Sequence, residues 1–114
     1  MKNVLEKALM FDFYGELLTE KQKEIYELYY LNDYSLTEIA DDYGTTRQAV
    51  SDLLKRTENK LQNFEGKLGL IEKFSEQKRQ IKEILNITKE IDNTNTKDVH
   101  SKINDIEKII NSII

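Results

Sequence analysis

The fold of this chain is decided by residues 35–56, SLTEIADDYGTTRQAVSDLLKR. The pattern predicts two short amphipathic helices separated by a turn at Gly44, where a positive φ is needed. Ala40 is small enough to let the two helices cross closely, and Val50 and Leu53 are spaced to pack back on the first helix. This spacing, with a three-residue turn that begins at Gly44, is typical of a helix-turn-helix motif.

Three capping boxes indicate where helices begin. The pairs are Thr19 with Gln22, Ser35 with Glu38, and Thr45 with Gln48. In each pair the hydroxyl oxygen would accept a hydrogen bond from the amide three residues on, and the Glu or Gln would reach back to the cap amide. We therefore expect helices to start directly after Thr19, Ser35 and Thr45, and the first of these to end at Asn32 and Asp33.

The sequence on both sides of the motif also predicts helices. Before it, an i, i+4 ladder predicts a helix over residues 4–18. The ladder consists of Leu5, Leu9, Phe13 and Leu17, and Met10, Phe11 and Tyr14 widen its apolar stripe. After the motif, Gly66 and Gly69 predict a bend or a break, because glycine destabilises a helix interior. Further on, the polar residues 92–96 separate two more helices.

The last predicted helix has one face of one Val and five Ile residues between Val99 and Ile113. Such a face is too apolar to stay solvated, so we expect it to pack on residues 64–85 or across a homodimer. The predicted fold class is therefore all-α. A helix-turn-helix bundle without a wing would occupy residues 1–65, and residues 66–114 would form a C-terminal helical extension that packs on it or mediates dimerisation.

The composition excludes several classes of function. The 114 residues contain no cysteine, one histidine and four glycines, which argues against thiolate metal sites, Ser-His-Asp catalysis and Gly-rich phosphate loops. We expect no metal, no cofactor and no enzymatic activity. No apolar run approaches the ~20 residues of a membrane helix, and early acidic residues argue against a signal peptide. We therefore expect a cytoplasmic protein without membrane insertion.

One polar face of the helix that follows Thr45 is the candidate nucleic-acid-binding site. At 100° per residue, Ala49, Val50, Leu53, Leu54 and Leu61 fall on the opposite, buried face. The candidate residues are Thr46, Arg47, Gln48, Ser51, Lys55 and Arg56. Arg47 would pair with a guanine edge and Gln48 with an adenine edge, while the cations further along would meet phosphates.

The charge distribution argues in the other direction. The net charge is −4, and residues 1–66 alone carry about −5. Asp52 stands in the middle of the candidate face, and Asp41 and Asp42 lie on the neighbouring helix. Because phosphate neutralisation supplies most non-specific DNA affinity, a helical corner that never touches DNA remains an alternative.

The motif residues also carry a family resemblance. The runs Leu18–Lys23, Tyr34–Ala40 and Thr46–Arg56 resemble region 4 of sigma-70-type factors. Over residues 1–75 the chain is more closely similar to the YlxM-like family of small bacterial proteins. That resemblance implies a sigma-region-4-like helical fold, and a link to the signal recognition particle pathway.

The resemblance and the motif together give the functional hypothesis. The chain would be a helix-turn-helix, DNA-binding regulatory protein that takes part in the signal recognition particle pathway. The alternative is a module of that pathway that uses the same helical corner to bind a protein or the particle's RNA. The target sequence, the partner and the oligomeric state are left open by the sequence.

Overall fold

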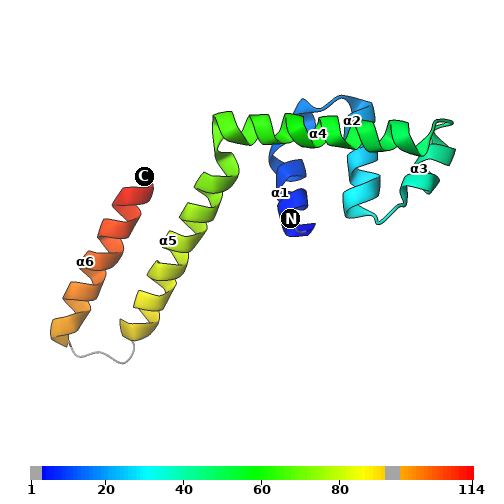
Figure 1. Cartoon of the computed structure of the whole chain (residues 1–114). Helices are drawn as coiled ribbons and strands as arrows, with labels where there is room; N and C mark the ends of the chain where they lie inside the picture. Colours follow the sequence, from blue (N-terminus) through cyan, green and yellow to red (C-terminus); the bar gives the residue numbers. More distant parts are fainter. Residues whose placement is uncertain (1–3, 92–95) are drawn as a thin grey trace. The chain divides into compact units, whose positions relative to one another are not determined.

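The computed structural model of the chain describes residues 4–91 and 96–114, and these residues are all-α with no strand. The helices are α1 (Val4–Tyr14), α2 (Glu20–Tyr26), α3 (Leu36–Asp42), α4 (Arg47–Leu68), α5 (Leu70–Ile91) and α6 (Thr96–Ile113) (Figure 1). A 3₁₀ turn, η1 (Gly15–Leu17), follows α1, and a π turn, η2 (Glu27–Leu31), follows α2. The chain divides into two compact units, one up to Ile71 and one from Glu72. No described helix combines the length and the apolar composition that a bilayer crossing requires.

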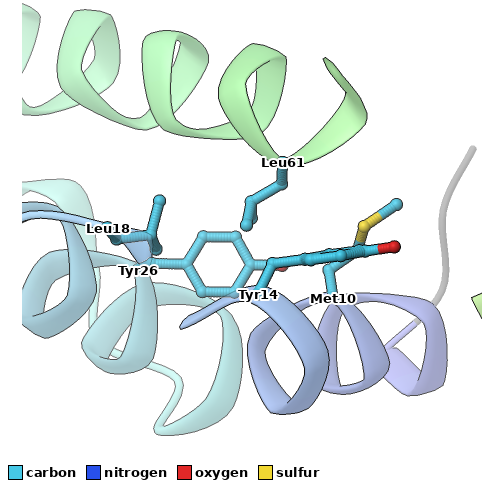
Figure 2. Close-up of a cluster of buried hydrophobic side chains, with 5 residues drawn as sticks. All are labelled: Met10, Tyr14, Leu18, Tyr26 and Leu61. Atoms are coloured by element: carbon cyan, nitrogen blue, oxygen red, sulfur yellow. The ribbon is translucent and has the colours of Figure 1, made fainter. Parts of the chain in front are cut away.

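The first helix buries the part of its predicted apolar stripe that contains Met10 and Tyr14, and not the ladder itself. The helix is confirmed, but it ends at Tyr14, and Leu5 and Leu17 are 66% and 51% exposed. The buried row joins α1 to α2 and α4 in one cluster (Figure 2). The cluster contains Met10, Tyr14, Leu18, Tyr26 and Leu61.

Hydrogen bonds made by the hydroxyls of two tyrosines explain why these side chains are buried and the ladder is not. The hydroxyl of Tyr26 donates to the carbonyl oxygen of Lys7 at 2.9 Å, and the hydroxyl of Tyr14 donates to the carboxylate of Glu65. Both rings are fully buried while their polar ends are satisfied. The 3₁₀ turn then changes the helical phase, so that Leu18 rather than Leu17 continues the row.

The predicted helix after Thr19 is confirmed at both ends. Thr19 and Gln22 form the expected capping box. The last turn is a π turn in which the Asn32 amide donates to the Glu27 carbonyl at 3.0 Å. Asp33 then takes a φ of +59°, which stops the helix. The buried side chains of α2 are Ile25 and Tyr26, whereas Leu28 and Tyr29, in the π turn, are only half-buried.

The helix-turn-helix pair, α3 and α4, forms as the sequence predicts. A second buried cluster of five residues holds it against α2: Ile25, Ile39, Ala40, Val50 and Leu54. Ser35 and Glu38 form the predicted capping box at the start of α3. Gly44 has a φ of +62°, as expected for the residue that turns the chain after α3.

Two details of this motif differ from the prediction. The cap of α4 is Thr46, whose hydroxyl accepts the Ala49 amide at 3.0 Å, and not Thr45. The turn is consequently longer than three residues, because α3 ends at Asp42 and α4 begins at Arg47. Both threonines offer a hydroxyl, so the sequence alone does not show which one stands at the helix start.

The break near the two glycines lies at Gly69 alone. Helix α4 runs through Gly66 and ends at Leu68, and Gly69 has a φ of +60°. The amides of Leu70 and Ile71, which are still part of the first unit, find acceptors within it: Leu70 donates to the Tyr14 hydroxyl at 3.2 Å, and Ile71 donates to a carboxylate oxygen of Glu65 at 3.0 Å. The end of α4 is thus tied to α1.

The second unit is a pair of antiparallel helices, α5 and α6 (Figure 1). Both predicted helices are confirmed, whereas most of the predicted polar linker, residues 92–95, lies outside the described residues. The ten buried hydrophobic side chains of the described residues all belong to the first unit. The predicted extension over residues 66–114, and its packing or dimerisation, stay predictions.

Candidate nucleic-acid interface

The outer face of α4 presents the predicted cations. Arg47, Gln48, Lys55 and Arg56 are all exposed. The opposite side of the helix is anchored by the side chains of Val50, Leu54, Thr57 and Leu61, each at most 4% exposed. Because these anchors fix the rotation of α4 about its own axis, the cations are held on the solvent side.

The predicted division of α4 into two faces needs two corrections. Ala49 is exposed and not part of the buried face, and Leu53 is half-buried at its margin. Thr57, which the sequence pattern did not select, is fully buried. Its hydroxyl donates to the Leu53 carbonyl at 2.8 Å, which satisfies the polar group inside the core. Its position could have been inferred, because a residue seven positions after the buried Val50 lies on the same face of a helix.

Two of the polar candidates already make contacts within the helix. The hydroxyl of Thr46 caps α4, as described above. The side-chain amide of Gln48 donates to a carboxylate oxygen of Asp52 at 2.9 Å, one helical turn along. An adenine edge would therefore have to replace Asp52 as the partner of the Gln48 amide.

Unlike Thr46 and Gln48, the three cations of this face make no polar side-chain contact, in the part of the chain that the structure describes, that would have to be broken. No ion pair or hydrogen bond within residues 4–91 and 96–114 engages Arg47, Lys55 or Arg56. The three side chains lie within three turns of the start of α4. They can therefore contact phosphate or base oxygens without first breaking a contact in the protein.

Beside the outer face lies an open pocket of about 170 Å³, where α4 meets α3 and the π turn. Ser51 and Lys55 from the candidate set line it, together with Tyr29, Tyr30, Leu36, Leu54 and Glu58. Ser51 is half-buried here and so is less accessible than the other candidates. The structure thus places Ser51 at the margin of the outer face, whereas Lys55 belongs both to the outer face and to the pocket lining.

A charged cluster that includes Tyr30 and Glu58 from the pocket lining was not predicted from the sequence. The carboxylate of Glu58 accepts from the ammonium of Lys7 and from the hydroxyl of Tyr30. The Lys7 ammonium also lies 4.1 Å from the centre of the Tyr30 ring. Burial, and then the hydrogen bond to Glu58, raises the pKa of Tyr30 above its usual range. This cluster joins α1, the π turn and α4, and three residues so distant in sequence gave no local signal.

The surroundings of the face are acidic. Asp41, Asp42 and Glu38 on α3 are exposed. Tyr43, at the end of α3, donates to a carboxylate oxygen of Glu24 at 2.6 Å, and this hydrogen bond is the main reason that the pKa of Tyr43 rises to about 12. Cations therefore dominate the outer face of α4 alone, and not the motif as a whole.

Comparison with known proteins agrees with this geometry. The family described as "Putative helix-turn-helix protein, YlxM / p13 like" (UPF0122) matches residues 1–109. The chain belongs to this family. The predicted resemblance is confirmed, as is the all-α helix-turn-helix fold.

Individual members of the UPF0122 family are close in sequence. A UPF0122 protein of Desulforamulus reducens is 51% identical over 87 residues, which is 76% of this chain and 74% of the relative. One of Bacillus pumilus is 46% identical over 100 residues, or 88% and 89% of the two chains. One of Acetivibrio thermocellus is 51% identical over 92 residues, or 81% and 79%. These relatives are named by family alone.

Proposed function

We propose that this chain is a DNA-binding regulatory protein that inserts the first turns of α4 into the major groove of duplex DNA. One observation carries the proposal: the two buried clusters fix α4 so that Arg47, Lys55 and Arg56 point to solvent without an ion pair in the described residues. The setting would be the signal recognition particle pathway in the cytoplasm, which the resemblance to the family implies.

The six candidate residues would have three kinds of role. Arg47, at the N-terminus of α4, would read a guanine edge, and Gln48 would read an adenine edge after releasing Asp52. Lys55 and Arg56 would contact backbone phosphates. Thr46 and Ser51 would hold the start of the helix and its margin against the groove.

A second candidate function has an observation of its own. The first unit, residues 1–71, carries a net charge of −4, and Asp52 lies among the cations of the face. A partner protein, or the particle's RNA, would then meet the same corner of α3 and α4. Salt dependence separates DNA from a protein partner, because the affinity for DNA falls linearly in a log–log plot against salt concentration, whereas binding to a protein through apolar helices barely responds. RNA is separated from DNA by titrating each directly.

The test is a titration of the full chain and four variants with duplex DNA and with structured RNA, at two salt concentrations. Arg47→Ala should cost about 1–3 kcal/mol of specific binding and relax the preference at one base pair. Lys55→Ala should weaken binding evenly across sequences and reduce the salt slope by about one. Gln48→Ala should relax the preference at a single adenine, and Asp52→Asn should strengthen non-specific binding, since it removes a negative charge near phosphate.

The matched control is Lys67→Ala, which removes an exposed cation from the last turn of the same helix. It should leave both the affinity and the salt slope unchanged. Binding of duplex DNA that responds equally to Lys67→Ala and Lys55→Ala would contradict the proposed face. If structured RNA binds and duplex DNA does not, the particle's RNA becomes the partner, and if neither binds at low salt, a partner protein does.

A further inference from the structure

The two helices of the second unit meet in one regular register. The side-chain amide of Gln80 on α5 donates to the Ser112 hydroxyl on α6 at 2.9 Å. Ten residues further along α5, Glu90 accepts from Lys102 at 2.6 Å, ten residues earlier on α6. The contacts of an antiparallel pair shift in opposite directions in this way, so the helices run antiparallel along their length.

The side chains between α5 and α6 follow a heptad pattern. The half-buried positions alternate in steps of three and four on both helices. The positions in this pattern are Gln77, Gln80, Ile84, Ile87 and Ile91 on α5, and Val99, Lys102, Ile106, Ile109 and Ile113 on α6, and Glu83 beside Ile84 is also half-buried. None of the described side chains from Glu72 onward is fully buried. Two helices alone therefore leave this seam without a core.

A second apolar row follows the seam one position later on each helix. The members of this row are Ile81, Leu85, Ile103, Ile110 and Ile114, and we refer to them as the open face. All except Ile114, the last residue, are between 40% and 53% exposed. In two antiparallel right-handed helices, positions directly after the seam lie on the same side of the pair. The open face is therefore one continuous surface.

We propose that a second copy of this chain covers the open face, so that two hairpins form a four-helix bundle. The five side chains offer on the order of 500 Å² per copy, and two copies reach about 1,000 Å², the size at which specific interfaces begin. Covering this face would also close the half-buried seam from one side, which supplies the missing core.

The charges of the two units favour this occupant. Residues 72–114 carry eight Lys and Arg and eight Asp and Glu residues, so two hairpins meet without net repulsion. Residues 1–71 carry a net charge of −4, so two first units repel each other. Self-association is thus directed to the hairpin, and the first unit stays available for its own partner.

The test is sedimentation equilibrium of the full chain over about a hundredfold range of concentration, without nucleic acid. The mass should rise from 13.4 kDa to twice that value as the concentration increases. The double variant Ile81→Glu/Ile110→Glu places charges at neighbouring levels of the open face and should stay at 13.4 kDa throughout.

The control variant is Leu17→Glu, because Leu17 is 51% exposed in the first unit, close to the 52% of Ile81. It should associate like the unaltered chain. Since the charged double variant can also unfold the hairpin, Ile81→Ala provides a milder test. It should keep its helical circular dichroism and weaken association about tenfold.

Three results would overturn the proposal. The first is a mass of 13.4 kDa for the unaltered chain at every concentration, which would mean that the chain itself or solvent covers the open face. The second is a dimer that survives Ile81→Glu/Ile110→Glu, and the third is a dimer that Leu17→Glu also dissociates. Because the measurement contains no nucleic acid, its outcome is independent of whether α4 binds DNA.

Discussion

The two units bury their apolar residues in opposite ways, although both are made of amphipathic helices. In the first unit, α4 packs on α1, α2 and α3, and the two clusters contain five fully or almost fully buried residues each. In the second unit, the described isoleucines of α5 and α6 stay half-buried or exposed. An apolar face therefore becomes a core only when a third element covers it.

The largest expected loss of stability comes from an alanine substitution in the core of the first unit, and the same substitution in the second unit should cost much less. Ile39→Ala removes a side chain that is fully buried between α3 and α4 and should cost about 3 kcal/mol. Ile84→Ala, on the half-buried seam of the hairpin, should cost about 1 kcal/mol. All six tyrosines lie between positions 14 and 43, so tyrosine fluorescence in urea follows the first unit, while far-UV circular dichroism follows both. Equal losses for the two variants would contradict the comparison.

The turn of the helix-turn-helix motif should give the next largest effect. Gly44→Val should cost about 2 kcal/mol, because a β-branched residue is strained at a φ of +62°. The added side chain would meet no other atom within 4 Å, so the cost is one of backbone conformation. Gly66→Ala is the control: the same helix continues through Gly66, and alanine there should stabilise it by about 0.5–1 kcal/mol. A Gly44→Val protein with an unchanged urea midpoint would remove the assigned role of Gly44.

Alkaline pH should weaken the first unit through its tyrosines. Burial raises the pKa of Tyr26 and of Tyr30 above the usual value near 10, and the hydrogen bond to Glu24 raises that of Tyr43 to about 12. Because the folded state favours the neutral phenol, this stabilisation is complete below about pH 10 and is lost as the pH rises through the folded pKa values. The urea midpoint measured by tyrosine fluorescence should therefore fall above pH 10. For Tyr43→Phe it should fall less steeply between about pH 10 and 12, and parallel curves would contradict the assigned role of the Glu24 hydrogen bond.

The smallest expected effect concerns the outer face of α4. Arg47→Ala and Lys55→Ala should change the free energy of unfolding by less than about 0.5 kcal/mol, since both side chains are exposed and neither pairs within the described residues. Thermal unfolding followed by circular dichroism measures this. A loss comparable to that of Ile39→Ala would show that the outer face belongs to the fold of the first unit.

The sequence predicts the fold best where a local signal and a tertiary contact agree. Ser35, Gly44 and Val50 each have a local chemical role that survives in the structure. The ladder of leucines in α1 was misleading, because periodicity shows that a helix has an apolar face but not which of two adjacent rows is buried. Tyr14 and Tyr26 decide that question through hydrogen bonds to distant residues.

The candidate site could be predicted in outline but not in detail. The exposure of Arg47 and Lys55 follows from the periodicity of α4. The contact between Gln48 and Asp52 was within reach of the sequence, because residues four apart on a helix are neighbours. The cluster around Glu58 depends on how α1 and the π turn pack on α4, and that packing is not encoded in any short segment.

The buried tyrosines also bear on how the protein is made. Tyr14 is closed in by Leu61 and Phe64, and its hydroxyl contacts Glu65 and the amide of Leu70, which are near the end of the first unit. A nascent chain that has passed the helix-turn-helix motif still lacks these contacts, so the aromatic surface of its earliest helix stays open to solvent and to chaperones. Helix α1 is therefore synthesised before the motif but sheltered only after it.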